Sequence, residues 1–154
     1  MPQIQKTATI NAPIERVFEA IDDPEMMPRY VPSVTKVSDI HRTDERLRDT
    51  FRVTYEMLGI HFDQLFTYTE YDRPRRITAR FTGPMTGTMS CRLEPHGDST
   101  LATVEIDYQM PGGVLGKAAD RLVAERMNER TAEHMLENIK ALVESQGAPP
   151  PSNG

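Results

Sequence analysis

The amino-acid sequence predicts an α+β fold in which a curved antiparallel sheet of about seven strands packs against one long C-terminal helix. Apolar residues recur with a period of two along most of residues 34–108, which is typical of strands with one buried face. Turn residues separate these segments and leave no room for crossover helices, so neighbouring strands are expected to be antiparallel. After residue 113 the apolar period lengthens to that of a helix.

Residues 6–10 are expected to form the first strand, and two short helices are expected to follow it. The first helix has apolar residues at the spacing of one helical face, namely Ile14, Val17, Phe18 and Ile21. Asn11 is the candidate N-cap of this helix. A second short helix is expected between Pro24 and Tyr30, because Pro32 cannot continue it.

Further segments that alternate between apolar and polar residues complete the predicted sheet. These segments are residues 34–40, 47–57, 60–71, 77–81, 85–93 and 102–108. In the second of them, Phe51, Val53 and Tyr55 share one face. Arg52 and Thr54 lie on the other, so the alternation indicates a buried inner face and a solvated outer face.

A helix of about 30 residues is predicted from Val114 to Glu144, because no glycine or proline interrupts the run after Gly116. Gln146 to Gly154 include three consecutive prolines and are expected to be a disordered tail. Residues 1–145 are therefore predicted to form one domain, with residues 146–154 as its tail.

Composition and charge narrow the possible functions. The chain of 154 residues has a formal net charge of −5, which disfavours nucleic acid as a partner because phosphate backbones repel it. Cys91 is the single cysteine, so an internal disulfide is excluded. No apolar stretch approaches the roughly 18 residues of a membrane span. We therefore expect a cytoplasmic protein without stable membrane insertion, and the sequence specifies no protein partner.

Short motifs along residues 4–144 follow a distinctive order and spacing. They are residues 10–18 (INAPIERVF), Asp23-Pro24-Glu25, Tyr30-Val31-Pro32, Pro74-Arg75-Arg76-Ile77, Ser99-Thr100 and Pro111-Gly112-Gly113. This series resembles the START-like, or SRPBCC, superfamily, which includes polyketide cyclases, coenzyme Q-binding proteins and proteins of the birch-pollen-allergen type. The resemblance implies a helix-grip fold, in which a curved sheet wraps around the C-terminal helix and leaves a hydrophobic cavity between them.

The function that the resemblance implies is binding or carriage of a hydrophobic small molecule, such as a lipid, a quinone or an aromatic polyketide-like compound. A cyclase or dehydratase of polyketide type using the same cavity is the alternative, and an interaction module with a vestigial cavity is a third. The residues expected to line the cavity are Tyr30, Phe51, Val53, Tyr55, Phe66, Tyr68, Phe81, Met85, Met89, Ile106, Tyr108, Leu115, Ala119 and Leu122.

Residues that indicate catalysis are few. Asp49 shares a strand face with Phe51 and is the candidate general base, because an apolar cavity raises the pKa of a carboxyl group. The four histidines lie on separate segments without metal-ligand spacing. Residues 112–118 depart from a phosphate-binding loop, since Ala118 replaces the required Ser or Thr. We therefore expect a non-catalytic protein with no catalytic residues, no metal and no cofactor.

Overall fold

The computed structural model describes residues 3–57, 59–109 and 118–147. A seven-stranded sheet and a long C-terminal helix form its framework, which confirms the predicted fold class. The strands are β1 (Gln3–Ile10), β2 (Val34–His41), β3 (Thr50–Met57), β4 (Ile60–Asp72), β5 (Arg76–Thr82), β6 (Thr86–His96) and β7 (Ser99–Gln109). The helices are α1 (Ile14–Asp22), the 3₁₀ turn η1 (Pro24–Met26), α2 (Met27–Tyr30) and α3 (Ala118–Gly147).

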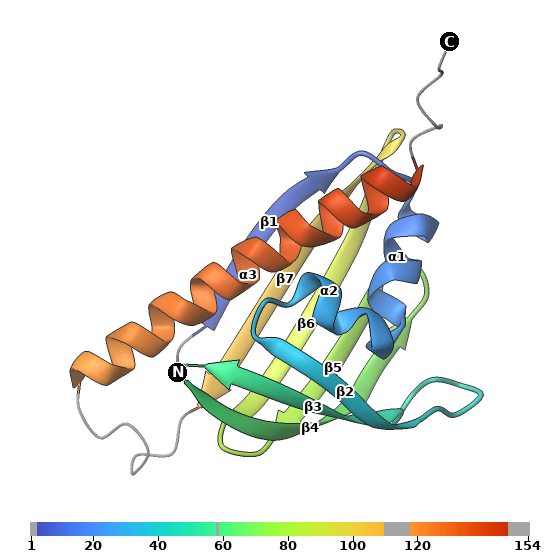
Figure 1. Cartoon of the computed structure of the whole chain (residues 1–154). Helices are drawn as coiled ribbons and strands as arrows, with labels where there is room; N and C mark the ends of the chain where they lie inside the picture. Colours follow the sequence, from blue (N-terminus) through green and yellow to red (C-terminus); the bar gives the residue numbers. More distant parts are fainter. Residues whose placement is uncertain (1–2, 58, 110–117, 148–154) are drawn as a thin grey trace.

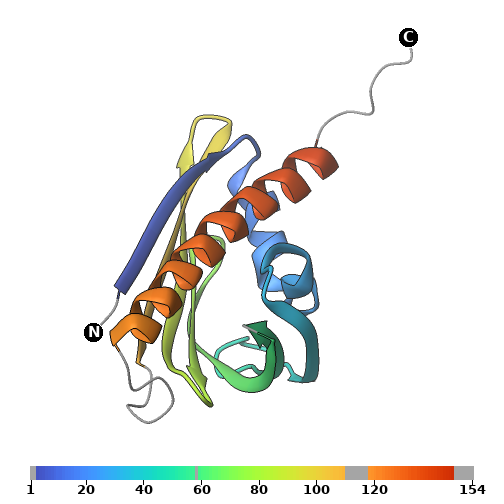
Figure 2. The same ribbon diagram turned by 60° about the vertical axis from the view of Figure 1, so that its left-hand side comes forward.

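The order of strands across the sheet is β1-β7-β6-β5-β4-β3-β2, and every neighbouring pair is antiparallel. β2 to β7 form a meander, whereas β1 pairs with β7 at the edge opposite β2. α1, η1 and α2 therefore carry the chain over the sheet from one edge to the other (Figure 1). α3 runs obliquely beside β1 and β7, and also contacts α1 and α2 (Figures 1 and 2).

The core fills the space between the concave face of the sheet and the helices. Along β3, Phe51, Val53 and Tyr55 are buried. The residues that alternate with them, such as Arg52 and Glu56, are exposed. α3 buries one side of its C-terminal half, which contributes Ala132, Met135, Leu136, Ile139 and Val143. This spacing is that of a helix with one apolar face.

The end of α3 differs from the prediction. The helix continues to Gly147, three residues beyond the predicted end at Glu144. The predicted disordered tail is therefore wrong for Gln146 and Gly147, which are helical. No stop signal precedes Gly147 in this segment, and glycine commonly ends helices. The predicted helical residues 114–117 and the tail residues 148–154 lie outside the described residues.

The predicted N-cap of α1 is wrong. Pro13 occupies the N-cap position, and Asn11 caps nothing there. Instead, the Asn11 N–H donates to Glu144 Oε2 of α3 at 2.9 Å, and Asn11 Oδ1 accepts a hydrogen bond from Ser99 Oγ at 3.1 Å. Asn11 thus joins the connection between β1 and α1 to α3 and to β7, through contacts that a local capping rule does not consider.

β6 and β7 approach each other closely at Gly87, which lies opposite Tyr108. A β-carbon added to Gly87 would lie 2.0 Å from the Asp107 carbonyl oxygen and 2.8 Å from Tyr108 Cα. Both are backbone atoms, so no side-chain rotation relieves the clash. The pairing of β6 with β7 therefore requires glycine at this position.

Gly87→Ala is expected to lower the free energy of unfolding by about 2–3 kcal/mol, because overpacking forces the backbone to shift. Urea denaturation followed by circular dichroism measures this loss. Thr88→Ala, at the neighbouring exposed position, is the control and should cost less than about 1 kcal/mol. Equal losses in the two variants would contradict the close approach of the two strands.

Candidate ligand-binding site

Among the described residues, two small cavities lie between the inner face of the sheet and the helices. The Tyr30 cavity has a volume of about 40 Å³ and the Gln64 cavity a volume of about 30 Å³. The described residues lining the Tyr30 cavity are Ile21, Met27, Tyr30, Phe51, Phe66, Tyr68, Ile77, Ala79, Met89, Cys91 and Met135. Those lining the Gln64 cavity are Val31, Tyr55, Gln64, Phe81, Met85, Met89, Ile106, Tyr108 and Thr131. Both cavities therefore combine residues of the sheet with residues of α3.

The structure places most of the predicted lining residues at one of these cavities. At the Tyr30 cavity these are Tyr30, Phe51, Phe66, Tyr68 and Met89. At the Gln64 cavity they are Tyr55, Phe81, Met85, Met89, Ile106 and Tyr108. Val53 is buried but lines neither cavity. Leu115 and the side chains of Ala119 and Leu122 lie outside the described part, and a binding role for the whole set stays a prediction.

Gln64 is the main lining residue that the sequence interpretation missed. It is 1% exposed and lies between Phe62 and Phe66 at an inward position of β4. A strict period-two count along β4 assigns it to the inner face, whereas a count of apolar residues passes over it. Strand periodicity also cannot identify lining residues that come from helices and their ends, which here are Ile21, Met27, Val31, Thr131 and Met135.

Stacked aromatic rings form one floor beneath both cavities. Phe51 and Phe66 stack with ring centroids 5.4 Å apart, and Phe66 and Phe81 stack at the same distance of 5.4 Å. The three residues are direct cross-strand partners on β3, β4 and β5. Phe66 lines the Tyr30 cavity and Phe81 lines the Gln64 cavity. One aromatic surface therefore extends from the first cavity to the second.

Three tyrosines and one cysteine at the cavities remain protonated at neutral pH, because burial raises their pKa values. Burial raises the pKa of the Tyr30 hydroxyl well above its usual range. Burial likewise raises the pKa of Tyr55 and of Tyr68. The buried Cys91 thiol has its pKa raised to about 12 for the same reason. These phenols and this thiol therefore act as neutral groups, and the phenols are potential hydrogen-bond donors.

Gln64 is held in place by the turn between β5 and β6. Its Oε1 accepts a hydrogen bond from the Met85 N–H at 3.1 Å. Gly83 permits this arrangement, because a β-carbon there would lie 2.2 Å from the same Oε1 atom. The amide of Gln64 is therefore a fixed polar group in an otherwise mostly apolar cavity.

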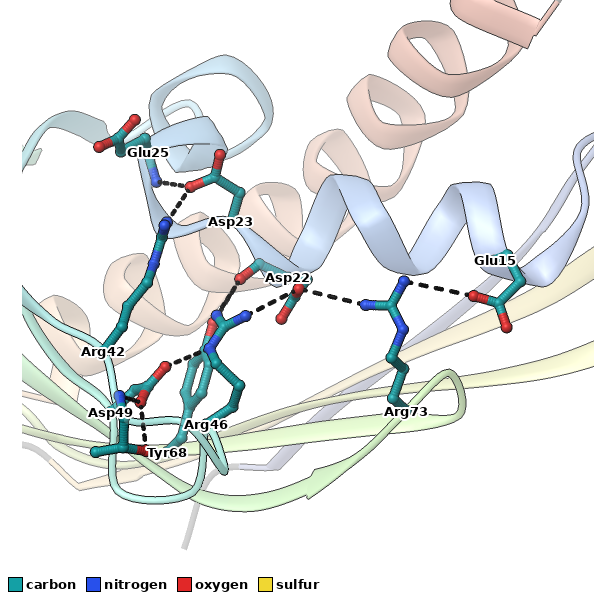
Figure 3. Close-up of polar contacts among 10 residues, drawn as sticks. Glu15, Asp22, Asp23, Glu25, Arg42, Arg46, Asp49, Tyr68 and Arg73 are labelled. Atoms are coloured by element: carbon teal, nitrogen blue, oxygen red, sulfur yellow. Dashed lines mark hydrogen bonds and ion pairs between the residues drawn. The ribbon is translucent and has the colours of Figure 1, made fainter.

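Asp49, the candidate general base, is engaged in structural contacts instead (Figure 3). It is 1% exposed and lines neither cavity. Its carboxylate accepts hydrogen bonds from the Thr43 N–H at 2.6 Å and from Thr43 Oγ1 at 3.0 Å. It also pairs with Arg46 Nε at 2.5 Å. With these donors around it, Asp49 anchors the segment before β3 and faces neither cavity.

Two arginines tie α1 to the sheet through Asp22, the last residue of that helix (Figure 3). Arg46 Nη1 lies 3.1 Å from Asp22 Oδ2, and Arg46 Nη2 donates to the Asp22 carbonyl oxygen at 2.9 Å. Arg73, between β4 and β5, lies 3.5 Å from the carboxylates of both Asp22 and Glu15. The helix dipole disfavours an acidic residue at a C-terminus, and these arginines offset that effect. The network thus fixes α1, which supplies Ile21 to the Tyr30 cavity.

Other site types find no support in the part of the chain that the structure describes. No group of three His, Cys, Asp or Glu side chains there is placed to hold a metal ion. None of the described helices combines the length and apolar character needed to cross a bilayer. Cys91 is a buried free thiol.

A curved antiparallel sheet packed around a long C-terminal helix, with apolar cavities between them, defines a helix-grip protein. The sequence match agrees with this class. Residues 1–144 match the family described as polyketide cyclase/dehydrase and lipid transport, and the chain belongs to that family. This membership supports hydrophobic-ligand binding or polyketide cyclase-type activity as the general function. No curated protein matches the sequence.

Solved structures share the fold at low sequence identity. A protein from Thermus thermophilus superposes with a TM-score of 0.83 at 19% identity, covering 96% of this chain and 100% of that one. The Zhui aromatase/cyclase from Streptomyces sp. R1128 also gives 0.83 at 19% identity, covering 95% of each chain. A START superfamily protein from Mycobacterium smegmatis gives 0.75 at 20% identity, covering 94% and 98%. At these identities the likeness establishes the fold alone.

Arg46→Gln is expected to lower the free energy of unfolding by about 3 kcal/mol, because it leaves the buried Asp49 carboxylate without its charged partner. Arg52→Gln is the matched control, since Arg52 pairs with Asp39 and Asp63 at exposed positions. Its loss should stay below about 1 kcal/mol. Guanidinium denaturation of both variants measures the difference, and losses of equal size would contradict the role of Arg46 as the partner of a buried carboxylate.

Proposed function

We propose that this protein binds and carries an uncharged hydrophobic small molecule between the sheet and α3, and that residues 1–145 form the binding domain. One observation carries the proposal. Every described residue lining the two cavities is apolar or uncharged, with no Asp, Glu, His, Lys or Arg among them. Burial of apolar ligand surface would supply most of the affinity, at about 25 cal/mol per Å². A charged ligand would instead lose its hydration without gaining an ionic partner.

The two cavities are smaller than the ligand that we propose. Pockets for drug-sized molecules typically have volumes of roughly 300–1,000 Å³, against about 40 and about 30 Å³ here. Binding therefore requires side chains to move apart. Methionine suits this role because its unbranched thioether chain adapts its shape. The described lining of the cavities contains four methionines, namely Met27, Met85, Met89 and Met135.

The aromatic floor and the tyrosines favour a flat, conjugated ligand with an oxygen acceptor over a purely aliphatic one. Phe51, Phe66 and Phe81 offer ring faces for stacking, and such contacts contribute about 0.5–1.5 kcal/mol beyond burial. Tyr30 and Tyr68 line the same cavity as protonated phenols. The Tyr68 hydroxyl already donates to the Asp22 carbonyl oxygen at 3.4 Å, so we propose that Tyr30 donates a hydrogen bond to a carbonyl or phenol oxygen of the ligand.

A cyclase or dehydratase function is the weaker alternative. Such chemistry requires a group that takes up and releases protons near neutral pH. The described lining residues contain no carboxylate and no imidazole, and Asp49 is engaged by Arg46 and Thr43. The raised pKa of the lining tyrosines makes them poor bases at neutral pH. These observations support carriage over catalysis.

Native mass spectrometry of the protein purified from its own host tests the proposal. An uncharged apolar compound that co-purifies and keeps its mass during incubation would support a carrier. Conversion of that compound into a new mass by the protein alone would support the enzyme instead. A protein that retains no compound and binds no apolar probe would contradict both functions.

2-Naphthol is expected to bind at least about 100-fold more tightly than 2-naphthoate at pH 7.5, because the carboxylate loses its hydration without a cationic partner. Tyr30, Tyr55 and Tyr68 stay protonated in this range because their pKa values are raised, so they do not contribute to a change of affinity with pH. Affinity for naphthoate should therefore rise as the pH falls toward the pKa of the ligand, whereas affinity for naphthol should stay constant between pH 5 and pH 8. Isothermal titration calorimetry measures both, and equal affinities at pH 7.5 would contradict a neutral site.

Tyr30→Phe is expected to weaken 2-naphthol binding by about 3–10-fold, which corresponds to the loss of one hydrogen bond to the naphthol oxygen. Tyr71→Phe is the control, because Tyr71 lines neither cavity. Both variants retain their rings, so apolar burial is unchanged. If calorimetry gave the same affinity for Tyr30→Phe and Tyr71→Phe, Tyr30 would have no part in orienting this probe.

A further inference from the structure

Met89 is the one residue that lines both cavities among the described lining residues. It lies on β6, where Ala79 and Ile106 are its cross-strand partners on the two neighbouring strands. It is partly buried and packs against the core. The side chain of Met89 therefore stands where the Tyr30 cavity and the Gln64 cavity come closest.

The floor of the two cavities is continuous, so what separates them lies above it. Phe66 in the Tyr30 cavity stacks directly on Phe81 in the Gln64 cavity, with 5.4 Å between ring centroids. A flat ligand could lie across both rings without moving either. The side chain of Met89, shared by both cavities, is then the group that such a ligand would meet.

The surroundings of Met89 allow its side chain to move. Ala79, its partner on β5, has only a methyl group and itself lines the Tyr30 cavity. A change of rotamer leaves the backbone hydrogen bonds of β6 intact. The unbranched side chain of methionine has several low-energy rotamers, unlike the β-branched residues that are common in strands.

We infer that Met89 determines the length of ligand that the protein accepts. In the arrangement described here, Met89 divides the interior into two compartments, and a ligand that spans both must displace its side chain. The inference rests on the proposed function, and it adds a specificity-determining residue that is distinct from Tyr30, which is proposed to orient the ligand.

A series of 4-alkylphenols from 4-ethylphenol to 4-decylphenol, titrated by calorimetry into the full chain, tests this inference. Each methylene group that enters an apolar site raises affinity about fourfold, so affinity climbs with chain length until the available space is filled. The quantity to be compared is the alkyl chain length beyond which the affinity no longer increases. Met89→Ala is expected to move this limit to longer chains by at least about two methylene groups, and Met89→Phe to shorter ones.

Met85→Ala is the matched control, because Met85 lines the Gln64 cavity alone. It removes the same atoms and should move the limit less than Met89→Ala does. Met89→Val, which suits a strand, replaces the alanine variant if that variant does not fold. Equal limits in the wild type and in the Met89 variants would overturn the inference, as would equal shifts in Met85→Ala and Met89→Ala.

Crystal structures of the free variants separate this inference from the proposed function. Met89→Ala should contain one continuous cavity, and Met89→Phe should contain two. Two separate cavities in Met89→Ala would overturn the role of Met89, whatever the titrations give. A continuous cavity in a variant that binds no alkylphenol, together with a wild type that binds none, would contradict the proposed function and with it any selection by length.

Discussion

The pairing of β1 with β7 is the constraint on which the rest of the structure depends. It joins the first strand to the last along the whole of β1, from Gln3 opposite Asp107 to Ile10 opposite Thr100. Since β2 lies at the other edge, α1, η1 and α2 must cross the sheet to reach it. α3 follows β7 and packs beside β1 on the same face. The pairing of β1 with β7 therefore determines that the helices cover one face of the sheet and enclose an interior there.

The described residues that line the two cavities include no charged side chain, although 27% of the chain is charged. Asp49 is the informative case, because it lies two residues before Phe51 on the inner face of the same segment. Arg46 and Thr43 enclose its carboxylate, and Arg46 also holds the end of α1. Arg46 thus compensates the charge of Asp49 and also fixes α1, which forms one side of the Tyr30 cavity. The same contacts therefore stabilise the fold and keep the Asp49 charge away from the cavity.

The sequence predicts the fold well because the sheet and α3 depend on regular periodicities. Phe51, Phe66 and Phe81 could be assigned to the inner face for this reason. The site itself depends on curvature and on the packing of helices, which periodicity does not contain. Val53 and Gln64 show the difference: both point inward, yet the apolar residue lines no cavity and the polar one does. Asn11 was misassigned because its partners, Glu144 and Ser99, are distant in the sequence.

Under the proposed function, selection by charge and selection by size would depend on different features of this protein. The aromatic floor belongs to paired strands, whose backbone hydrogen bonds would have to break before it could move. The small cavity volumes instead depend on side chains such as Met89, which change shape without breaking a strand. A substitution at a methionine would then alter which sizes fit and leave the proposed preference for uncharged ligands in place. Under this proposal, substitutions of this kind would change the accepted ligand within one helix-grip scaffold without changing its charge.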